Sequence, residues 1–287
     1  MGNKVLLKKL TLYICTLAAL LLLIFGLAYW NEAYIARVPI LMYHHLAETG
    51  PPGSTISAEA FETHIKALKD AGYTAVSFDA LCDYVYNGAD LPEKPVVITF
   101  DDGYMSVYDT AFPILQKYNT KATVFLIGVL HGESFYKGLY YLPITPHLGD
   151  AEIIEMAASG IFSIQSHSYD MHKLVQYEPD SPRVGVTRME HERKEDYIDA
   201  LTLDFALASE QIENSIGDRP FVFSYPYGRF TRQAERVLRD AEVLVTVTTS
   251  PKINMIYRDS PNSLYRLGRF NVPGDIPPSE LLAMIRG

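Results

Sequence analysis

The stretch Val96-Val97-Ile98-Thr99-Phe100, which runs directly into Asp101-Asp102-Gly103-Tyr104, is the best guide to the architecture of this 287-residue chain. Its first five residues are apolar or β-branched on both faces, which is typical of a strand buried on both sides of a parallel sheet. Two carboxylates follow at the carboxyl end of this strand, where parallel α/β folds carry their functional groups. The stretch therefore predicts an α/β fold with a site at this edge of the sheet.

Further β-rich runs alternate with helix-length segments along the rest of the chain. The segment Ser57–Ala71 has apolar residues at helical spacing, and Glu190–Ile216 is a longer helical pattern that ends at Gly217. Such alternation predicts parallel strands joined by crossover helices, and about 250 residues suit a (β/α) barrel. The other predicted strands are Ile40–Tyr43, Thr74–Phe78, Thr123–Ile127, Ile161–Ile164, Phe221–Tyr225, Val243–Val247 and Tyr265–Leu267.

The N-terminus has the pattern of a membrane anchor. Residues 10–30 are apolar and uncharged and follow three lysines, so a helix here would span a bilayer with the N-terminus in the cytoplasm. The run is longer than the core of most cleaved signal peptides. We expect a basic cytoplasmic segment at 1–9, a transmembrane anchor or uncleaved signal at 10–30, a linker at 31–37 and one extracytoplasmic domain at 38–287. The protein would then be a single-pass protein of the cell membrane, or secreted if the run were cleaved.

Charge and cysteine content exclude several partners. The chain carries a net charge of −9, and residues 1–37 hold four basic residues and one acidic residue, so residues 38–287 carry −12. Such a domain repels a phosphate backbone, and we expect no nucleic acid partner. Cys15 lies in the apolar run and Cys82 in a predicted helix, so neither a disulfide framework nor a cysteine metal site is expected. No sequence feature predicts a protein partner.

Polar clusters follow four of the predicted strands, and the carboxyl ends of parallel strands meet at one edge. Successive side chains on a strand point in opposite directions, so Asp101 and Asp102 are expected to have different tasks. One can bind a metal while the other acts as a base, unless the pair only caps the next helix. The four clusters are Tyr43-His44-His45, Asp101-Asp102-Gly103-Tyr104, His167-Ser168-Tyr169-Asp170-Met171-His172 and Pro226-Tyr227-Gly228.

The histidines of these clusters suggest metal and acid chemistry. His167 and His172 are five residues apart, and a strand end that enters a turn could bring both to one ion. Two His with one Asp leave room for water, as in catalytic zinc-type sites. Asp170, between them, either orients a ligand or faces solvent. A general acid near neutral pH is usually His, and strand alternation lets only one of His44 and His45 face the site; we favour His44.

Together these motifs resemble the polysaccharide deacetylases of the NodB-homology type, carbohydrate esterase family four. TFDDGY at 99–104 is similar to the family's first motif, and SHSYDMH at 166–172 is similar to its metal-binding His motif in a longer-spaced form. The resemblance runs from about Val38 to at least Gly228 and implies a distorted (β/α) barrel. It also implies one divalent ion, with zinc favoured and nickel, cobalt or manganese as alternatives. The implied roles are Asp101 as general base, Asp102, His167 and His172 as metal ligands, and the backbone N–H of Tyr227 as oxyanion donor.

Two departures from the family pattern matter. The third motif of the family usually has Arg two residues before the Pro, where this chain has Ser224. The family's usual C-terminal His acid is also absent, because no His follows His191. The bacterial poly-N-acetylglucosamine deacetylase subgroup resembles the chain more closely, since it places that His near the start of the domain in a motif like LMYHHL at 41–46. On that resemblance His44 is the general acid.

The sequence thus predicts a metal-dependent enzyme that removes N-acetyl groups from N-acetylglucosamine residues of an extracellular or cell-wall polysaccharide, with poly-N-acetylglucosamine favoured. One alternative keeps the chemistry but takes peptidoglycan or a small acetylated sugar as substrate. A second is a non-catalytic carbohydrate-binding barrel, for which Ser224 is the argument. A glycoside hydrolase is disfavoured, because adjacent Asp101 and Asp102 cannot flank a glycosidic bond on opposite sides.

Overall fold

Two compact units make up the chain, Met1–Ala36 and Arg37–Gly287. The first contains a helix over residues 11–23. The second contains the sheet and the candidate site. The computed structural model describes residues 8–9, 11–23, 34–51, 53–136, 142–173, 183–274 and 276–286.

The predicted transmembrane segment at residues 10–30 lies partly outside the described residues, as does part of the predicted linker at 31–37. Within the described ranges, none of the helices is both long enough and apolar enough to cross a membrane.

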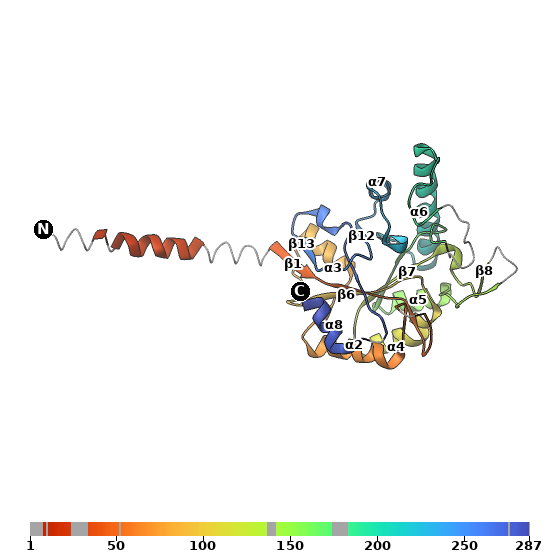
Figure 1. The fold of residues 1–287 in the computed structure, drawn as a ribbon, viewed down its shortest axis with the longest axis horizontal. Helices are drawn as coiled ribbons and strands as arrows, with labels where there is room; N and C mark the ends of the chain where they lie inside the picture. The colour runs from red at the N-terminus through yellow and green to blue at the C-terminus, as the bar shows by residue number, and fades with distance from the viewer. Residues whose placement is uncertain are drawn as a thin grey trace. The chain divides into compact units, whose positions relative to one another are not determined.

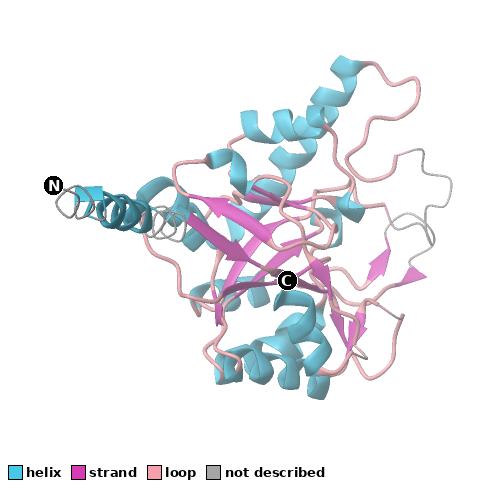
Figure 2. Ribbon diagram, turned by 60° about the vertical axis from the view of Figure 1, so that its left-hand side comes forward, coloured by secondary structure: helices cyan, strands magenta, loops and turns pink. Residues whose placement is uncertain are grey.

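Parallel strands form the main sheet of the second unit, in the order β12-β11-β10-β7-β6-β2-β14, with the short strand β5 paired to β6. The strands lie at the centre and the helices around them (Figure 2). The strand bounds are β1 Ile35–Val38, β2 Ile40–Tyr43, β3 His45–Leu46, β4 Thr55–Ile56, β5 Thr74–Ala75, β6 Pro95–Phe100, β7 Ala122–Leu126, β8 Phe135–Tyr136, β9 Leu142–Pro143, β10 Phe162–Ser166, β11 Val222–Ser224, β12 Val245–Val247, β13 Asn254–Tyr257 and β14 Phe270–Asn271.

The parallel (β/α) arrangement predicted from the sequence is confirmed. All six residues of β6 are buried, as expected for a strand covered on both faces. An isolated parallel bridge between Val247 and Leu267 joins the β12 edge to the segment that enters β14, which pairs with β2 at the other edge. The predicted strand Tyr265–Leu267 is wrong in extent, because only Leu267 pairs there and the strand itself begins at Phe270.

Helices cover the outside of the sheet, with α2, α4 and α8 on one side and α6 and α7 on the other (Figure 1). Ser57 begins α2 as predicted, because its side chain accepts a hydrogen bond from the Ala60 N–H. The helix bounds are α2 Ala58–Asp70, α3 Phe78–Cys82, η1 Asp83–Asn87, η2 Val107–Ala111, α4 Phe112–Lys117, η3 Gly128–Leu130, α5 Asp150–Ala158, α6 Lys194–Ile216, η4 Pro226–Gly228, α7 Arg232–Asp240, η5 Pro261–Leu264 and α8 Pro278–Arg286.

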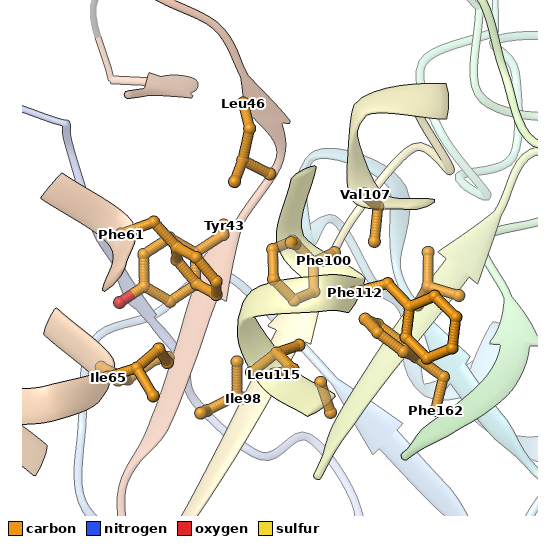
Figure 3. Packing of buried hydrophobic residues seen from close by; sticks show 14 of the residues in the cluster. Tyr43, Leu46, Phe61, Ile65, Ile98, Phe100, Val107, Phe112, Leu115 and Phe162 are labelled. Carbon is orange, nitrogen blue, oxygen red and sulfur yellow. The ribbon is translucent and has the colours of Figure 1, made fainter. Parts of the chain in front are cut away.

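Aromatic rings fill the space between α2, α4 and the sheet (Figure 3). The rings of Tyr43 and Phe61 meet edge to face with centroids 5.2 Å apart, and Phe61 lies 5.6 Å from Phe100. Phe100 in turn lies 5.9 Å from Phe162. Tyr43 and Phe100 end the strands that lead into His44 and Asp101, so this packing fixes the positions at which those residues leave the sheet.

We expect Phe61→Ala to lower the free energy of unfolding by about 3–5 kcal/mol, because it removes a fully buried ring and leaves a cavity between α2 and β6. Urea denaturation of the full chain measures this difference. Phe135, which is half exposed, serves as the control, and Phe135→Ala should change the unfolding free energy by less than about 0.5 kcal/mol. Equal effects of the two substitutions would contradict the packing described here.

Candidate active site

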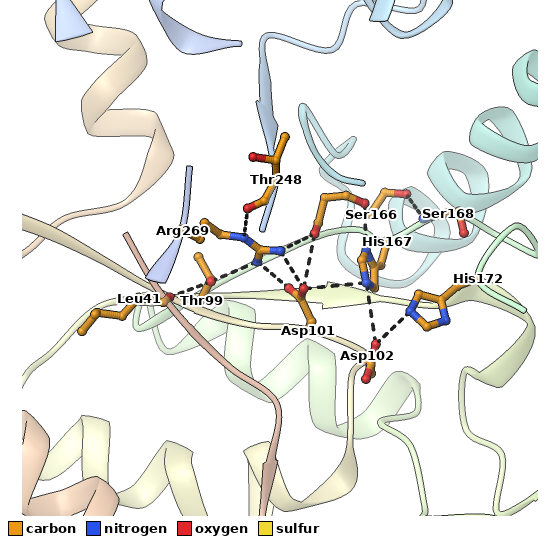
Figure 4. A network of polar contacts seen from close by, with 11 residues as sticks. Leu41, Thr99, Asp101, Asp102, Ser166, His167, Ser168, His172, Thr248 and Arg269 are labelled. Atoms are coloured by element: carbon orange, nitrogen blue, oxygen red, sulfur yellow. Dashed lines mark hydrogen bonds and ion pairs between the residues drawn. The ribbon is translucent and has the colours of Figure 1, made fainter. Parts of the chain in front are cut away.

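The polar clusters predicted to converge follow the carboxyl ends of β2, β6, β10 and β11. Figure 4 shows two of them, with Asp101 and Asp102 beside His167 and His172. Backbone conformation helps to aim them. Asp102, Ser168 and Tyr227 all have positive φ angles, of 72°, 78° and 57° respectively, although none is glycine. Such angles are uncommon for other residues and often occur at functional sites. The left-handed turn at Asp102 also explains how two adjacent carboxylates reach different surroundings.

Three of the predicted residues form a cluster with the composition of a metal site. Single ligand atoms of Asp102, His167 and His172 all lie within 4.8 Å of one another. The Oδ1 atom of Asp102 lies 3.6 Å from Nε2 of His167 and 3.5 Å from Nε2 of His172. Two imidazole nitrogens and one carboxylate oxygen converging in this way fit a divalent ion such as zinc with a position left open.

His167 is prepared to act as a ligand. Its Nδ1 lies 2.8 Å from the carbonyl oxygen of Ser224, which requires the proton on Nδ1 and leaves the Nε2 lone pair free toward Asp102. Burial lowers the pKa of His167 to about 4, so the ring is neutral at pH 7. A neutral imidazole held by its second nitrogen is the usual form of a metal-ligating His.

His172 is held by contact with Tyr227. The two rings lie 4.6 Å apart between centroids at 33°, and the Tyr227 hydroxyl donates a hydrogen bond to the carbonyl of Lys173. Tyr227 thus joins η4 to the end of the His167–His172 segment. Asp170 does not point toward the ligands, because its carboxylate is half exposed and accepts a bond from Lys173 at 2.8 Å.

A buried ion pair holds Asp101. Arg269, which is completely buried, donates from Nη1 to Oδ1 at 2.6 Å and from Nη2 to Oδ2 at 2.7 Å. Its remaining donors go to the Thr248 carbonyl, the Thr99 hydroxyl and the Ser224 hydroxyl, so every N–H of the guanidinium has an acceptor. Such a bidentate pair fixes the plane and position of the carboxylate.

Burial raises the pKa of both carboxyls, but the electrostatic effect of neighbouring groups outweighs it. The Arg269 guanidinium holds the pKa of Asp101 well below its usual range despite the burial of that carboxyl. Burial likewise opposes ionisation of Asp102, yet His172, His44 and His167 lower its pKa. Both carboxylates are therefore ionised at neutral pH.

His44 and His45 have different surroundings. His44 lies near enough to Asp101 and Asp102 for its charge to lower the pKa of both carboxylates. The Nδ1 atom of His45 instead lies 2.8 Å from the Ser106 hydroxyl, and its ring faces Tyr104 at 5.2 Å. Of the two imidazoles, His44 is the one that acts electrostatically on both carboxyls.

Arg269 was missed in the sequence because no motif includes it. The last predicted strand, Tyr265–Leu267, ends two residues before Arg269. A search for a cation at the carboxyl end of the last predicted strand would have found it. Asp204 on α6, which contacts the segment between His167 and His172, was missed as well, since an isolated acidic residue in a long amphipathic helix gives no local signal.

Comparisons with known proteins show which family the sequence matches. The sequence model described as polysaccharide deacetylase matches residues 88–245, more than half of the chain. YxkH of Bacillus subtilis, whose name places it among the polysaccharide deacetylases, is 30% identical over 216 residues. The match covers 75% of this chain and 66% of YxkH.

Two further relatives are informative. The poly-beta-1,6-N-acetyl-D-glucosamine N-deacetylase of Escherichia coli K12 is 26% identical over 192 residues, which cover 61% of this chain but only 28% of that protein. A solved structure of a de-N-acetylase from Aggregatibacter actinomycetemcomitans superposes with a TM-score of 0.74 and 26% identity. That match covers 87% of this chain and all of the other. The chain therefore spans two thirds or less of both sequence relatives.

We expect Arg269→Met to lower the free energy of unfolding by about 3–5 kcal/mol, because it leaves the buried Asp101 carboxylate without its partner. Adding Asp101→Asn should recover part of that loss. A double-mutant cycle from urea denaturation measures the coupling. Arg236→Met, at an exposed position of α7, is the control and should change the unfolding free energy by less than about 0.5 kcal/mol. If the effects of Arg269→Met and Asp101→Asn on the unfolding free energy were additive, the two side chains would not be coupled, and the ion pair would not stabilise the fold as described.

Proposed function

Because the chain belongs to the polysaccharide deacetylase family, we propose that it removes N-acetyl groups from N-acetylglucosamine residues of a polysaccharide with the help of one divalent metal ion. The observation that carries the proposal is that a set of metal ligands and a fixed carboxylate lie next to each other at one edge of the sheet. Asp102, His167 and His172 offer three ligand atoms, and Asp101 lies beside them with its carboxylate fixed by Arg269.

The residues divide the chemistry of amide hydrolysis between them. A divalent ion bound by Asp102, His167 and His172 would act as a Lewis acid toward the acetamide carbonyl and make water more acidic. Asp101, ionised and 3.7 Å from Nε2 of His167, would accept the proton of the attacking water. The backbone N–H of Tyr227 would donate to the oxygen that gains negative charge.

His44 would then protonate the departing sugar nitrogen. The support is that His44 acts electrostatically on both carboxyls and, unlike His167, is not a proposed metal ligand. A His acid is also suited to a neutral pH. Because His172 is one of the proposed ligands and His45 is bonded to Ser106, His44 is the residue left for this task among the three.

Poly-N-acetylglucosamine is the substrate we favour. The support is the similarity to the poly-beta-1,6-N-acetyl-D-glucosamine N-deacetylase of E. coli and the N-terminal position of His44, which is shared with the subgroup that the sequence resembles. Peptidoglycan and small acetylated sugars are the alternatives for the same chemistry. We propose zinc as the ion, since one carboxylate and two imidazoles suit it, with nickel, cobalt and manganese as alternatives.

We also propose that the domain lies outside the cytoplasm, where such a polymer would be found. The support for this location, and for attachment to the cell membrane, is the apolar run at residues 10–30 behind three lysines. Cleavage of this run would give a secreted form of the same domain.

Release of acetate from N-acetylglucosamine oligomers by the full chain, with added zinc, tests the proposed roles. Asp101→Asn and His44→Ala should each lower the rate at least about a hundredfold, because a general base or acid contributes that much. His45→Ala is the matched control, since the neighbouring imidazole contacts Ser106 instead of the carboxylates, and it should keep most of the activity. If His44→Ala and His45→Ala lowered the rate of acetate release equally, the assignment of His44 as the general acid would be wrong.

Metal dependence has its own test. Treatment of the chain with a chelator should abolish acetate release, and added zinc should restore it. The reason is that the acetamide carbonyl is not polarised when no ion is bound by the three ligands. His172→Ala should bind zinc more weakly, whereas His191→Ala, at an exposed position, should match the parent. Full activity after complete removal of divalent ions would refute the metal-dependent mechanism.

A further inference from the structure

We propose that Asp204, on α6, is a positioning residue. It holds the backbone between His167 and His172 so that both imidazoles can bind one metal ion, and it thereby increases the affinity of the site for that ion. This inference rests on the proposed function, because it concerns the same ion. Asp204 lies outside the two family-like motifs at 99–104 and 166–172, and its hydrogen bonds go to backbone amides between the ligands. It acts instead on the segment 167–172, which we call the ligand loop.

Asp204 binds the middle of the ligand loop with both carboxylate oxygens. Its Oδ2 accepts a hydrogen bond from the Tyr169 N–H at 2.9 Å, and its Oδ1 accepts one from the Asp170 N–H at 2.7 Å. The carboxylate is almost fully buried, with 6% of the residue exposed. Two consecutive amides between the two histidines are thus fixed by one side chain from a helix distant in sequence.

The spacing of the histidines explains why such support is needed. Ligands four residues apart would share one face of a helix, but His167 and His172 are five apart and lie in an irregular turn. The chain reverses at Ser168, whose φ of 78° is an uncommon angle for serine. A turn without a helical hydrogen-bond ladder keeps its shape only through contacts from outside it.

The opposite side of the turn is also held. The N–H of Gly128 donates to the Ser168 carbonyl at 3.0 Å, and the N–H of Val129 donates to the Tyr169 carbonyl at 2.9 Å. Residues of η3 therefore take the carbonyls of the turn while Asp204 takes its amides. The backbone between the ligands is clamped from both sides.

Burial of this carboxylate is unfavourable in itself, which favours a positional role. Burial raises the pKa of Asp204 to about 6, although its bonds from the two amides act in the opposite direction. The neighbours of Asp204 on the buried face of α6, Leu201, Phe205 and Ala208, are apolar. An apolar side chain at 204 could serve to anchor α6, but it could not bind the two amides.

Zinc affinity of the full chain, measured by competition with a chromogenic chelator, tests the inference. Asp204→Asn places an amide N–H donor against one of the two backbone donors, and we expect the zinc Kd to rise about 10- to 100-fold, as for other groups that orient metal ligands. Asp199→Asn is the matched control, the same change at an exposed position of the same helix, and its Kd should equal that of the parent.

A second measurement separates positioning from simple stability. Hydrogen exchange of the metal-free chain should show loss of protection at the Tyr169 and Asp170 amides in Asp204→Asn, and saturating zinc should return acetate release toward the parent rate. If thermal stability falls while the zinc Kd stays unchanged, Asp204 only anchors α6 and the inference is wrong. Should Asp204→Asn not fold, Asp204→Glu keeps the charge but shifts it by one methylene; an unchanged Kd there would equally overturn the inference.

Failure of the proposed function would look different. A parent chain that binds no divalent ion would overturn the metal site and this inference with it. A parent that binds zinc, together with an Asp204→Asn variant of equal affinity, would overturn the inference alone. A parent that binds zinc but releases no acetate would overturn the proposed function and leave the role of Asp204 in metal affinity standing.

Discussion

The buried ion pair between Arg269 and Asp101 is the interaction on which the geometry of the site depends. Arg269 immediately precedes β14 and bonds groups that belong to or directly follow β6, β11 and β12, namely Thr99, Asp101, Ser224 and Thr248. It therefore joins the two edges of the sheet at the end where the functional residues gather. A buried charge is tolerated only when its partners are complete. Displacement of β6 would leave a charge unpaired, and displacement of β11 or β12 would leave a buried guanidinium N–H without an acceptor. The same set of hydrogen bonds therefore fixes both the positions of the strands and the position of the Asp101 carboxylate.

The ion pair also explains why the two adjacent carboxylates, Asp101 and Asp102, have different surroundings and can have different roles. Asp101 ends in contact with the guanidinium, while the left-handed turn at Asp102 directs the next carboxylate to His167 and His172. One acidic group thus has a fixed counter-charge of the protein, and the other faces ligands that can share an ion. Without Arg269, two ionised carboxylates would face the same cluster of imidazoles with no fixed counter-charge to separate them.

Much of this could be predicted from the sequence, and the failures share a cause. Strand β6 and helix α2 follow from local periodicity, and Asp102, His167 and His172 follow from the rule that parallel strands end at one edge. Arg269 lies 168 residues from its partner, and Asp204 lies 34 and 35 residues from the amides that it binds. Such contacts are made by tertiary packing, and no local motif includes these residues. The predicted strand Tyr265–Leu267 was wrong in extent, because a single bridge at Leu267 stands there instead of a regular strand.

Ser224 shows why a position in a motif is weaker evidence than a group at a point in space. In the sequence, its occurrence where the family usually has Arg was the argument for a barrel without catalytic function. In the structure a guanidinium still meets the carboxylate, supplied by Arg269, and the Ser224 hydroxyl accepts one of its hydrogen bonds at 2.9 Å. A second arginine at 224 would bring another positive charge to a carboxylate whose oxygens Arg269 already binds, whereas serine offers a small acceptor. Arg269 therefore gives Asp101 the positive partner that an arginine at position 224 would supply. Ser224 is then no longer an argument for a barrel without catalytic function.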